Sequence, residues 1–206
     1  MANFFKDNDD LQYYFDKGVD WEALVRITEH EFAEASGDGF SSTEEAVAFY
    51  RDIVEMFGEF VASEIKPYEK EIDEQGVELV DGEVVFPERL AGIFEKIKEL
   101  DLHGLPIPRE LGGMNAPMLV YFLNSELMAR ADVSAMAHHG FHAGMGMAAL
   151  VFSALEGSTE VDPSTGRIVK TRWRDAIEEI AAGEAWGCMD ITEPDAGSDM
   201  AALRAM

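Results

Sequence analysis

Residues 185–199, AWGCMDITEPDAGSD, separate two kinds of sequence and so decide the fold class. The run from Ala185 to Thr192 holds few helix formers and several residues that favour strands. Pro194 and Gly197 then predict a turn. Upstream, the apolar residues mostly recur at helical spacing. We therefore expect a mainly α protein, in which a helical domain is followed by the first strand or strands of a β domain.

The turn itself, Thr192 to Asp199, has residue types suited to a ligand. Successive backbone N–H groups in such a turn make a concave site for an anion. The hydroxyls of Thr192 and Ser198 can donate to a phosphate or to a ring carbonyl. These residues indicate a loop for a phosphorylated, ring-bearing ligand, and they leave open an ordinary Asp-Ala-Gly turn.

A long amphipathic helix is predicted upstream. Ser42 and Glu45 have the spacing of a capping box, in which each residue satisfies a free backbone N–H group of the first turn. A single apolar stripe follows over residues 46–65. Pro67 lacks the backbone donor that a helix needs, so it kinks or ends the helix. The stripe indicates core packing.

Further elements follow from local signals. Asp81-Gly82 predicts a hairpin over residues 77–86. Pro87 fits the first position of a second helix, whose stripe runs over residues 90–100. Residues 118–129 predict a buried helix, because they are apolar on more than one face. Residues 157–171 are polar and predict a surface loop, whereas Arg174 to Ala182 predict a short helix that Gly183 ends.

Residues 1–40 are interpreted as an N-terminal extension with a packing role. Their aromatic and aliphatic side chains are too many for a free tail, and those from Trp21 to Ile27 have nearly helical spacing. We expect the extension to pack on a surface, which could belong to another subunit. The expected organisation is thus an extension (1–40), a helical domain (41–184) and an incomplete β domain (185–206).

Composition excludes several functions. The formal net charge is −25, from 16 Lys and Arg against 41 Asp and Glu, which argues against nucleic acid and against an anionic membrane surface. The apolar run 143–155 is too short to span a membrane. Cys188 is the single cysteine and the N-terminus lacks the pattern of a secretory signal, so a reducing, cytoplasmic location is expected.

Four segments, in order, resemble the acyl-CoA dehydrogenase family. They are HGLPIPRELGG (103–113), SELMARADVS (125–134), IAAGEAWGCMDITEP (180–194) and ITEPDAGSD (191–199), which is similar to the first signature of the family. The resemblance spans about residues 45–206. Three features depart from the family pattern: the extension, Leu111 where an aromatic residue is usual, and an insertion at 157–171.

The resemblance implies an FAD site at the end of the helical domain. Met189, Asp190, Ile191 and Thr192 would line the isoalloxazine, with the Thr192 hydroxyl near its reactive edge. Gly197 and Ser198 would lie by the pyrophosphate, and Ser198 also by the thioester of an acyl-CoA substrate. Met136, His139 and Gly140 would shape the site for the acyl tail. For the methionines, ordinary core packing is the alternative.

The resemblance also implies a reaction, the α,β-dehydrogenation of an acyl-CoA in fatty acid β-oxidation. The electrons would pass to an electron-transfer flavoprotein, and the complete enzyme would be a homo-oligomer. The glutamate base is expected beyond Met206, so no catalytic residue is assigned here. An acyl-CoA oxidase of the same superfamily and a non-catalytic assembly fragment are the alternatives. For His138, His139 and His142, a metal site is the alternative to the acyl site, but no familiar ligand spacing supports it.

Overall fold

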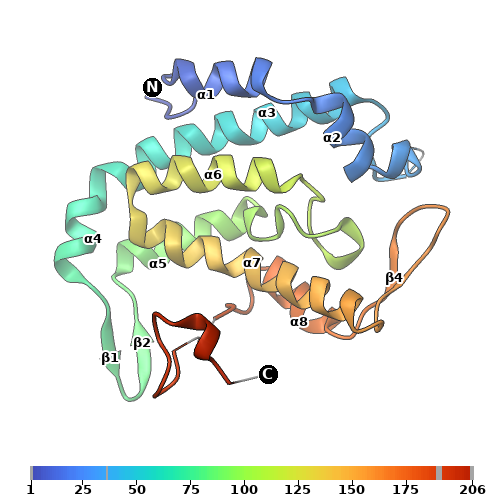
Figure 1. Cartoon of the computed structure of the whole chain (residues 1–206). Coiled ribbons are helices and arrows are strands. Elements are labelled where there is room, and N and C mark those ends of the chain that lie inside the picture. Colours follow the sequence, from blue (N-terminus) through green and yellow to red (C-terminus); the bar gives the residue numbers. More distant parts are fainter. Residues whose placement is uncertain (1, 36, 189–191, 205–206) are drawn as a thin grey trace.

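The computed structural model describes residues 2–35, 37–188 and 192–204 (Figure 1). The fold is mainly helical, as the sequence predicted. Its α-helices are α1 (Asp9–Tyr13), α2 (Trp21–Thr28), α3 (Thr43–Phe60), α4 (Glu69–Gln75), α5 (Glu88–Glu99), α6 (Met118–Ala131), α7 (Val133–Leu155) and α8 (Arg174–Ala181). Two short antiparallel hairpins complete it: β1 (Glu78–Val80) with β2 (Glu83–Val85), and β3 (Glu160–Val161) with β4 (Ile168–Lys170).

The helices are stacked in the order α3, α6, α7 and α8, with α5 behind α6 and α7 (Figure 1). The main core lies where α3, α5, α6 and the first half of α7 meet. A smaller apolar cluster under the second half of α7 joins Ile107 and Leu111 to Ile177 and Ile180 of α8. No helix within the described residues is long and apolar enough to cross a membrane.

Helix α3 begins where the sequence predicted. Ser42 is its N-cap, and the Ser42 hydroxyl accepts a hydrogen bond from the Glu45 N–H at 3.2 Å. The Glu45 carboxylate returns to the N–H of Ser41, one residue earlier than in an ordinary capping box. The helix continues as a π-helical turn from Val61 to Ile65, and Pro67 then lies in a 3₁₀ turn, Lys66–Tyr68, that leads into α4. Its apolar stripe is buried as predicted, except for Phe49, which is 37% exposed.

The N-terminal extension packs on this same chain, so the suggestion of another subunit is not needed for it. The Phe15 ring lies 5.8 Å from the Phe5 ring and 4.6 Å from the Trp21 ring, centroid to centroid. The Trp21 ring in turn lies 5.9 Å from the ring of Tyr50 of α3, centroid to centroid. The approach is close at Gly58, where an added Cβ would lie 2.8 Å from the backbone nitrogen of Phe5.

The loop that follows α5 is compact and buried. Leu105, Ile107 and Leu111 are at most 1% exposed. The loop folds back on itself, with the N–H of Asn115 donating to the carbonyl of Ile107 at 2.8 Å. Gly113 permits this turn, since a Cβ there would lie 2.0 Å from the Ile107 carbonyl oxygen. The loop thereby fixes the start of α6.

Both predicted turns at glycine are confirmed, and one predicted loop is wrong. Asp81 and Gly82 have φ values of 53° and 89°, which suit the tight turn between β1 and β2. Gly183 has a φ of 69° and follows the end of α8. Residues 157–171, predicted as a loop, contain the β3–β4 hairpin. Pro87 is the N-cap of α5, one residue before its predicted place.

The predicted β region is only partly described. No strand is assigned among residues 185–188 and 192–204. Met189, Asp190 and Ile191 lie outside the described residues. The start of a β domain and the three domain boundaries therefore stay predictions.

Candidate functional site

The TEPDAGSD segment forms a closed turn with exposed hydroxyls. The Glu193 N–H donates to the Ala196 carbonyl at 2.8 Å, and the Ala196 N–H donates back to the Glu193 carbonyl at 3.1 Å. Ala196 is buried beneath the turn, whereas Thr192 and Ser198 are exposed. The side chains of Thr192 and Ser198 are thus accessible to a ligand, as the predicted binding role requires.

Two of the predicted cofactor residues lie close together in this turn. A Cβ added to Gly197 would lie 3.7 Å from the methyl group of Thr192, so the Gly197 backbone faces that side chain. Ser198 follows directly and is exposed. The Glu193 carboxylate accepts hydrogen bonds from the Arg204 N–H at 3.0 and 3.1 Å and so ties the following segment to the turn. The remaining predicted residues, Met189, Asp190 and Ile191, lie outside the described residues.

Trp186 anchors the segment that leads into this turn. Its ring lies 4.1 Å from His138, 4.3 Å from His142 and 5.2 Å from His103, centroid to centroid. The Phe94 ring of α5 lies 5.0 Å away. The Trp186 side chain therefore packs on α7 and α5.

His103, His138, His139 and His142 form one group, which we call the histidine cluster. His103, His139 and His142 are at most 4% exposed. Burial, together with the neighbouring histidines, lowers the pKa of His139 to about 3 and of His103 to about 4. Burial also lowers the pKa of His142 and of His138. At neutral pH the cluster is therefore uncharged.

The tautomer of one member follows from its partner. His142 Nε2 lies 2.8 Å from the Ile180 carbonyl oxygen, which can only accept, so Nε2 carries the proton and Nδ1 is an acceptor. That Nδ1 has no hydrogen-bond partner among the described residues, and neither have the Nδ1 atoms of His103 and His139. Sequence reasoning missed His103, because it lies 35 residues before His138 and only the fold brings the two together.

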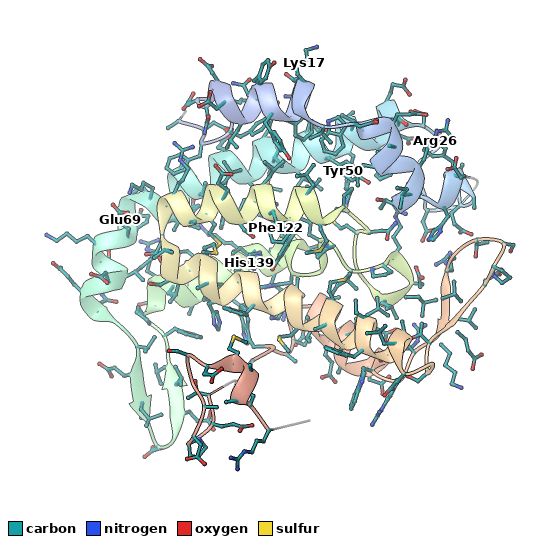
Figure 2. The ribbon with its side chains drawn as sticks, in the orientation of Figure 1. Lys17, Arg26, Tyr50, Glu69, Phe122 and His139 are labelled. Carbon is teal, nitrogen blue, oxygen red and sulfur yellow. The ribbon has the colours of Figure 1, made fainter. Side chains whose placement is uncertain are left out.

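The three residues predicted for the acyl tail lie on α7. His139 is buried in the histidine cluster (Figure 2). Met136 and Gly140 are partly buried, and the Tyr121 hydroxyl donates to the Gly140 carbonyl. None of the three lines the shallow cavity of about 350 Å³ that is formed by Ala137, His138, Phe141, Gly187 and Cys188. The role of the three residues stays a prediction.

Helices α6 and α7 also present an exposed apolar surface. The 23 residues of α7 include no Asp, Glu, Lys or Arg, although 28% of the chain is charged. On α7, Phe141, Phe152 and Leu155 are 51%, 67% and 76% exposed, and on α6 Phe122 is 60% exposed (Figure 2). Exposed apolar side chains that gather on one surface often mark a contact with another part of a protein.

Residues 48–160, more than half of the chain, match the family model described as the acyl-CoA dehydrogenase N-terminal domain. The helical fold and this match define the class, an oxidoreductase family whose members bind FAD. The chain belongs to the acyl-CoA dehydrogenase family.

Individual relatives agree with this assignment. The chain is 28% identical over 154 residues to 3-methylmercaptopropionyl-CoA dehydrogenase of Ruegeria pomeroyi, covering 75% of this chain and 24% of the relative. It is 28% identical to the probable acyl-CoA dehydrogenase YngJ of Bacillus subtilis, covering 70% and 32%. It is 23% identical to the mitochondrial isovaleryl-CoA dehydrogenase of Arabidopsis thaliana, covering 73% and 31%. The alignments thus span a quarter to a third of these relatives.

Proposed function

We propose that this chain is the N-terminal part of an FAD-dependent enzyme that dehydrogenates an acyl-CoA thioester between its α and β carbons. The observation that carries the proposal is the exposed Thr192–Asp199 turn at the end of a helical domain of this family. FAD, when bound, would accept the hydride from the β carbon. Fatty acid β-oxidation and a cytoplasmic location belong to the same proposal.

The residues of the turn have the chemistry that a flavin nucleotide needs. The Thr192 hydroxyl would donate to the ring near its reactive edge, and the exposed Ser198 hydroxyl would donate to the pyrophosphate or to the thioester. Gly197 lets the backbone come close to a ligand, since it has no side chain. The predicted strand Met189–Ile191 would run along the ring. The base that removes the α proton would belong to a C-terminal helical bundle.

Side chains of α6 and α7 support a proposal for the substrate and for contacts with other parts of the enzyme. The uncharged histidine cluster and Met136 would border the acyl tail without placing a charge beside it. The exposed apolar side chains of α6 and α7 would pack against further parts of the enzyme or of its oligomer. Electrons would pass to an electron-transfer flavoprotein.

The test uses the full-length protein that carries this chain. We expect a flavin absorbance band in the purified protein, bleaching of that band when acyl-CoA is added without oxygen, and reoxidation by electron-transfer flavoprotein. Thr192→Val should lower the rate of bleaching about tenfold, because it removes one hydrogen bond to the ring. Ser164→Ala, at the exposed tip of the β3–β4 hairpin, is the control and should leave the rate unchanged.

Other outcomes would identify other functions. Rapid oxygen consumption on addition of acyl-CoA, in place of transfer to the flavoprotein, would assign an oxidase. A full-length protein that is purified without flavin, and that binds none when FAD is added, would overturn the proposal in favour of an assembly role.

A further inference from the structure

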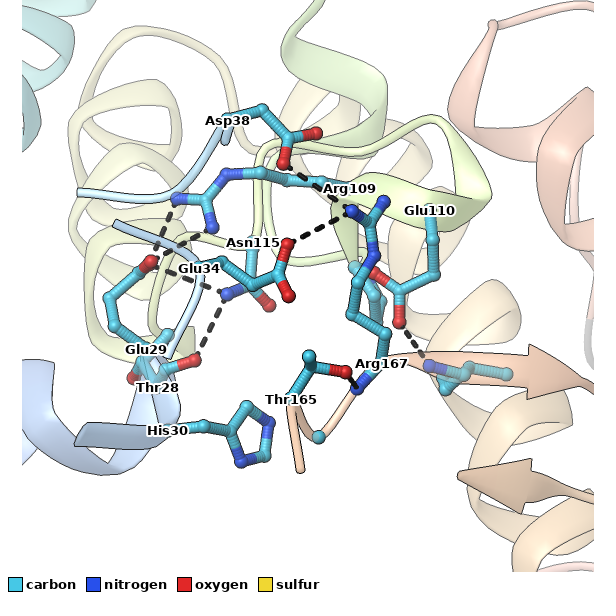
Figure 3. Close-up of a pocket in the computed structure, with 13 residues that line it drawn as sticks. Thr28, Glu29, His30, Glu34, Asp38, Arg109, Glu110, Asn115, Thr165 and Arg167 are labelled. Carbon is cyan, nitrogen blue, oxygen red and sulfur yellow. Dashed lines mark hydrogen bonds and ion pairs between the residues drawn. The ribbon is translucent and has the colours of Figure 1, made fainter. Parts of the chain in front are cut away.

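The two parts of the chain outside the family match meet at one place. Before the matched region lie Thr28, Glu29, His30, Glu34 and Asp38, and after it lie residues 165–168. Both line a cavity of about 160 Å³ together with the loop 108–115, which lies inside the match (Figure 3). The extension and the inserted hairpin are therefore neighbours.

The floor of this cavity is a buried ion pair. Two guanidinium nitrogens of Arg109 donate to the two carboxylate oxygens of Glu29, each at 2.9 Å. The Glu29 side chain is 1% exposed and that of Arg109 is 16% exposed. The Asn115 side chain donates to the Thr28 carbonyl at 3.0 Å. Glu29 thus fixes the start of the following segment to the loop.

The segment after Glu29 is strained. His30, Glu31 and Phe32 have φ values of 46°, 57° and 63°. This left-handed region is uncommon for residues other than glycine, and three in succession persist only where the surroundings hold them. We call residues 33–35 and 37–39 the strap. Phe32 and Phe40, on either side of it, pack against the main core and hold its ends in place.

Arg167, near the tip of the β3–β4 hairpin, holds the strap from the other side. Its Nη1 lies 3.1 Å from the Glu34 carboxylate and 3.5 Å from that of Asp38 (Figure 3). The three side chains are between 24% and 59% exposed, so salt can screen these pairs. The His30 ring covers Gly166, where an added Cβ would lie 2.3 Å from Nδ1.

The hairpin has its own attachment to the loop. The Ile168 N–H donates to the Glu110 carboxylate, and Arg174 donates to the Glu110 carbonyl at 2.9 Å. The attachment of the hairpin to the loop therefore does not depend on the strap. Without Arg167, the Glu34 and Asp38 carboxylates would lose the cation that they share.

We propose that the strap is a movable cover, which Arg167 holds closed over the loop 108–115 and which opens when the Arg167 ion pairs are screened or removed. Opening would uncover the Glu29–Arg109 pair, which lines the same cavity. The inference does not rest on the proposed dehydrogenase activity.

The test is hydrogen exchange of the chain, followed by mass spectrometry. Arg167→Ala should raise exchange in the strap about twofold to fivefold, the range expected when partly exposed ion pairs are lost. Arg172→Ala is the matched control, because Arg172 lies just after the same hairpin but pairs with Glu156 at 3.0 Å. It should leave exchange in the strap unchanged.

Salt gives a second, independent measurement. About 0.5 M NaCl shortens the Debye length to about 4 Å and should raise strap exchange in the wild type but not in Arg167→Ala. Should Arg167→Ala fail to fold, Glu34→Gln with Asp38→Asn removes the same pairs from the strap side. Equal strap exchange in the wild type and the folded variant would overturn the proposal, and so would an equal rise in Arg172→Ala.

Discussion

At the scale of the residue, Glu29 shows how a buried charge depends on its partner. Its carboxylate is nearly inaccessible to solvent and accepts hydrogen bonds from two guanidinium nitrogens of Arg109. It accepts a further hydrogen bond from the Phe40 N–H at 3.3 Å. The Asn115 side chain also donates to this carboxylate at 3.4 Å. Taking a carboxylate out of water is costly, and these partners offset the cost. The pair links the extension to the family loop, so its loss would affect two segments at once.

We therefore predict that Arg109→Ala destabilises the chain by about 3–5 kcal/mol, because it leaves the Glu29 charge buried and unpaired. Urea unfolding, followed by circular dichroism, measures this change. Arg109→Met with Glu29→Gln should recover part of the loss, since no charge then remains buried. Lys170→Ala, which breaks an exposed pair with Glu160, should change the free energy of unfolding by less than about 1 kcal/mol. An Arg109→Ala loss as small as that would contradict the prediction.

At the scale of the element, the N-cap of α3 is the clearest local signal in the chain. The Ser42 hydroxyl satisfies one free N–H group of the first turn, and Glu44 and Glu45 place negative charge there. Helix α3 contacts α2 and α6, so its stability bears on the whole domain.

Ser42→Ala should destabilise the chain by about 1 kcal/mol, the usual contribution of such a cap. For a chain of this size that lowers the melting temperature by about 2–4 °C. Ser63→Ala is the control, because the Ser63 hydroxyl bonds only the Glu59 and Phe60 carbonyls within its own helix. Equal melting temperatures for wild type and Ser42→Ala would show that the cap contributes nothing.

Elements with local signals were predictable, and elements fixed from a distance were not. The Ser42 cap and the Asp81-Gly82 turn depend on neighbours in sequence, so the pattern alone located them. The β3–β4 hairpin is held by Glu110, 58 residues before Ile168, and its polar composition predicted a loop. The surface that covers the extension, α3, could not be inferred from its apolar pattern. In the site, Thr192 and Ser198 came from a motif, whereas the contacts of Trp186 with three histidines needed the fold.

At the scale of the whole molecule, the histidine cluster makes stability depend on pH. Its members bring together the turn after α5, which holds His103, the helix α7 and Trp186. The folded-state pKa is about 3 for His139 and about 4 for His103, against about 6.5 for a histidine in an unfolded chain. The unfolded chain therefore binds more protons below about pH 6.5, and the free energy of unfolding decreases as the pH falls from there toward 4.

We predict that lowering the pH from 7 to 5 costs at most about 2 kcal/mol for each of these two histidines, as measured by urea unfolding at each pH. His139→Gln should reduce this loss, because its side chain cannot take up a proton. Met147→Leu, on the same helix but outside the cluster, should lose as much stability as the wild type. Because Trp186 packs on the cluster and the folded imidazoles stay neutral from pH 7 to 5, its fluorescence should stay constant over this range and change only as the pH falls toward 4, in a variant with Trp21 and Trp173 replaced by Phe. A free energy of unfolding that stays constant from pH 7 to 5, or a Trp186 fluorescence change that is complete by pH 5 in the folded chain, would mean that the imidazoles are not buried as a neutral group.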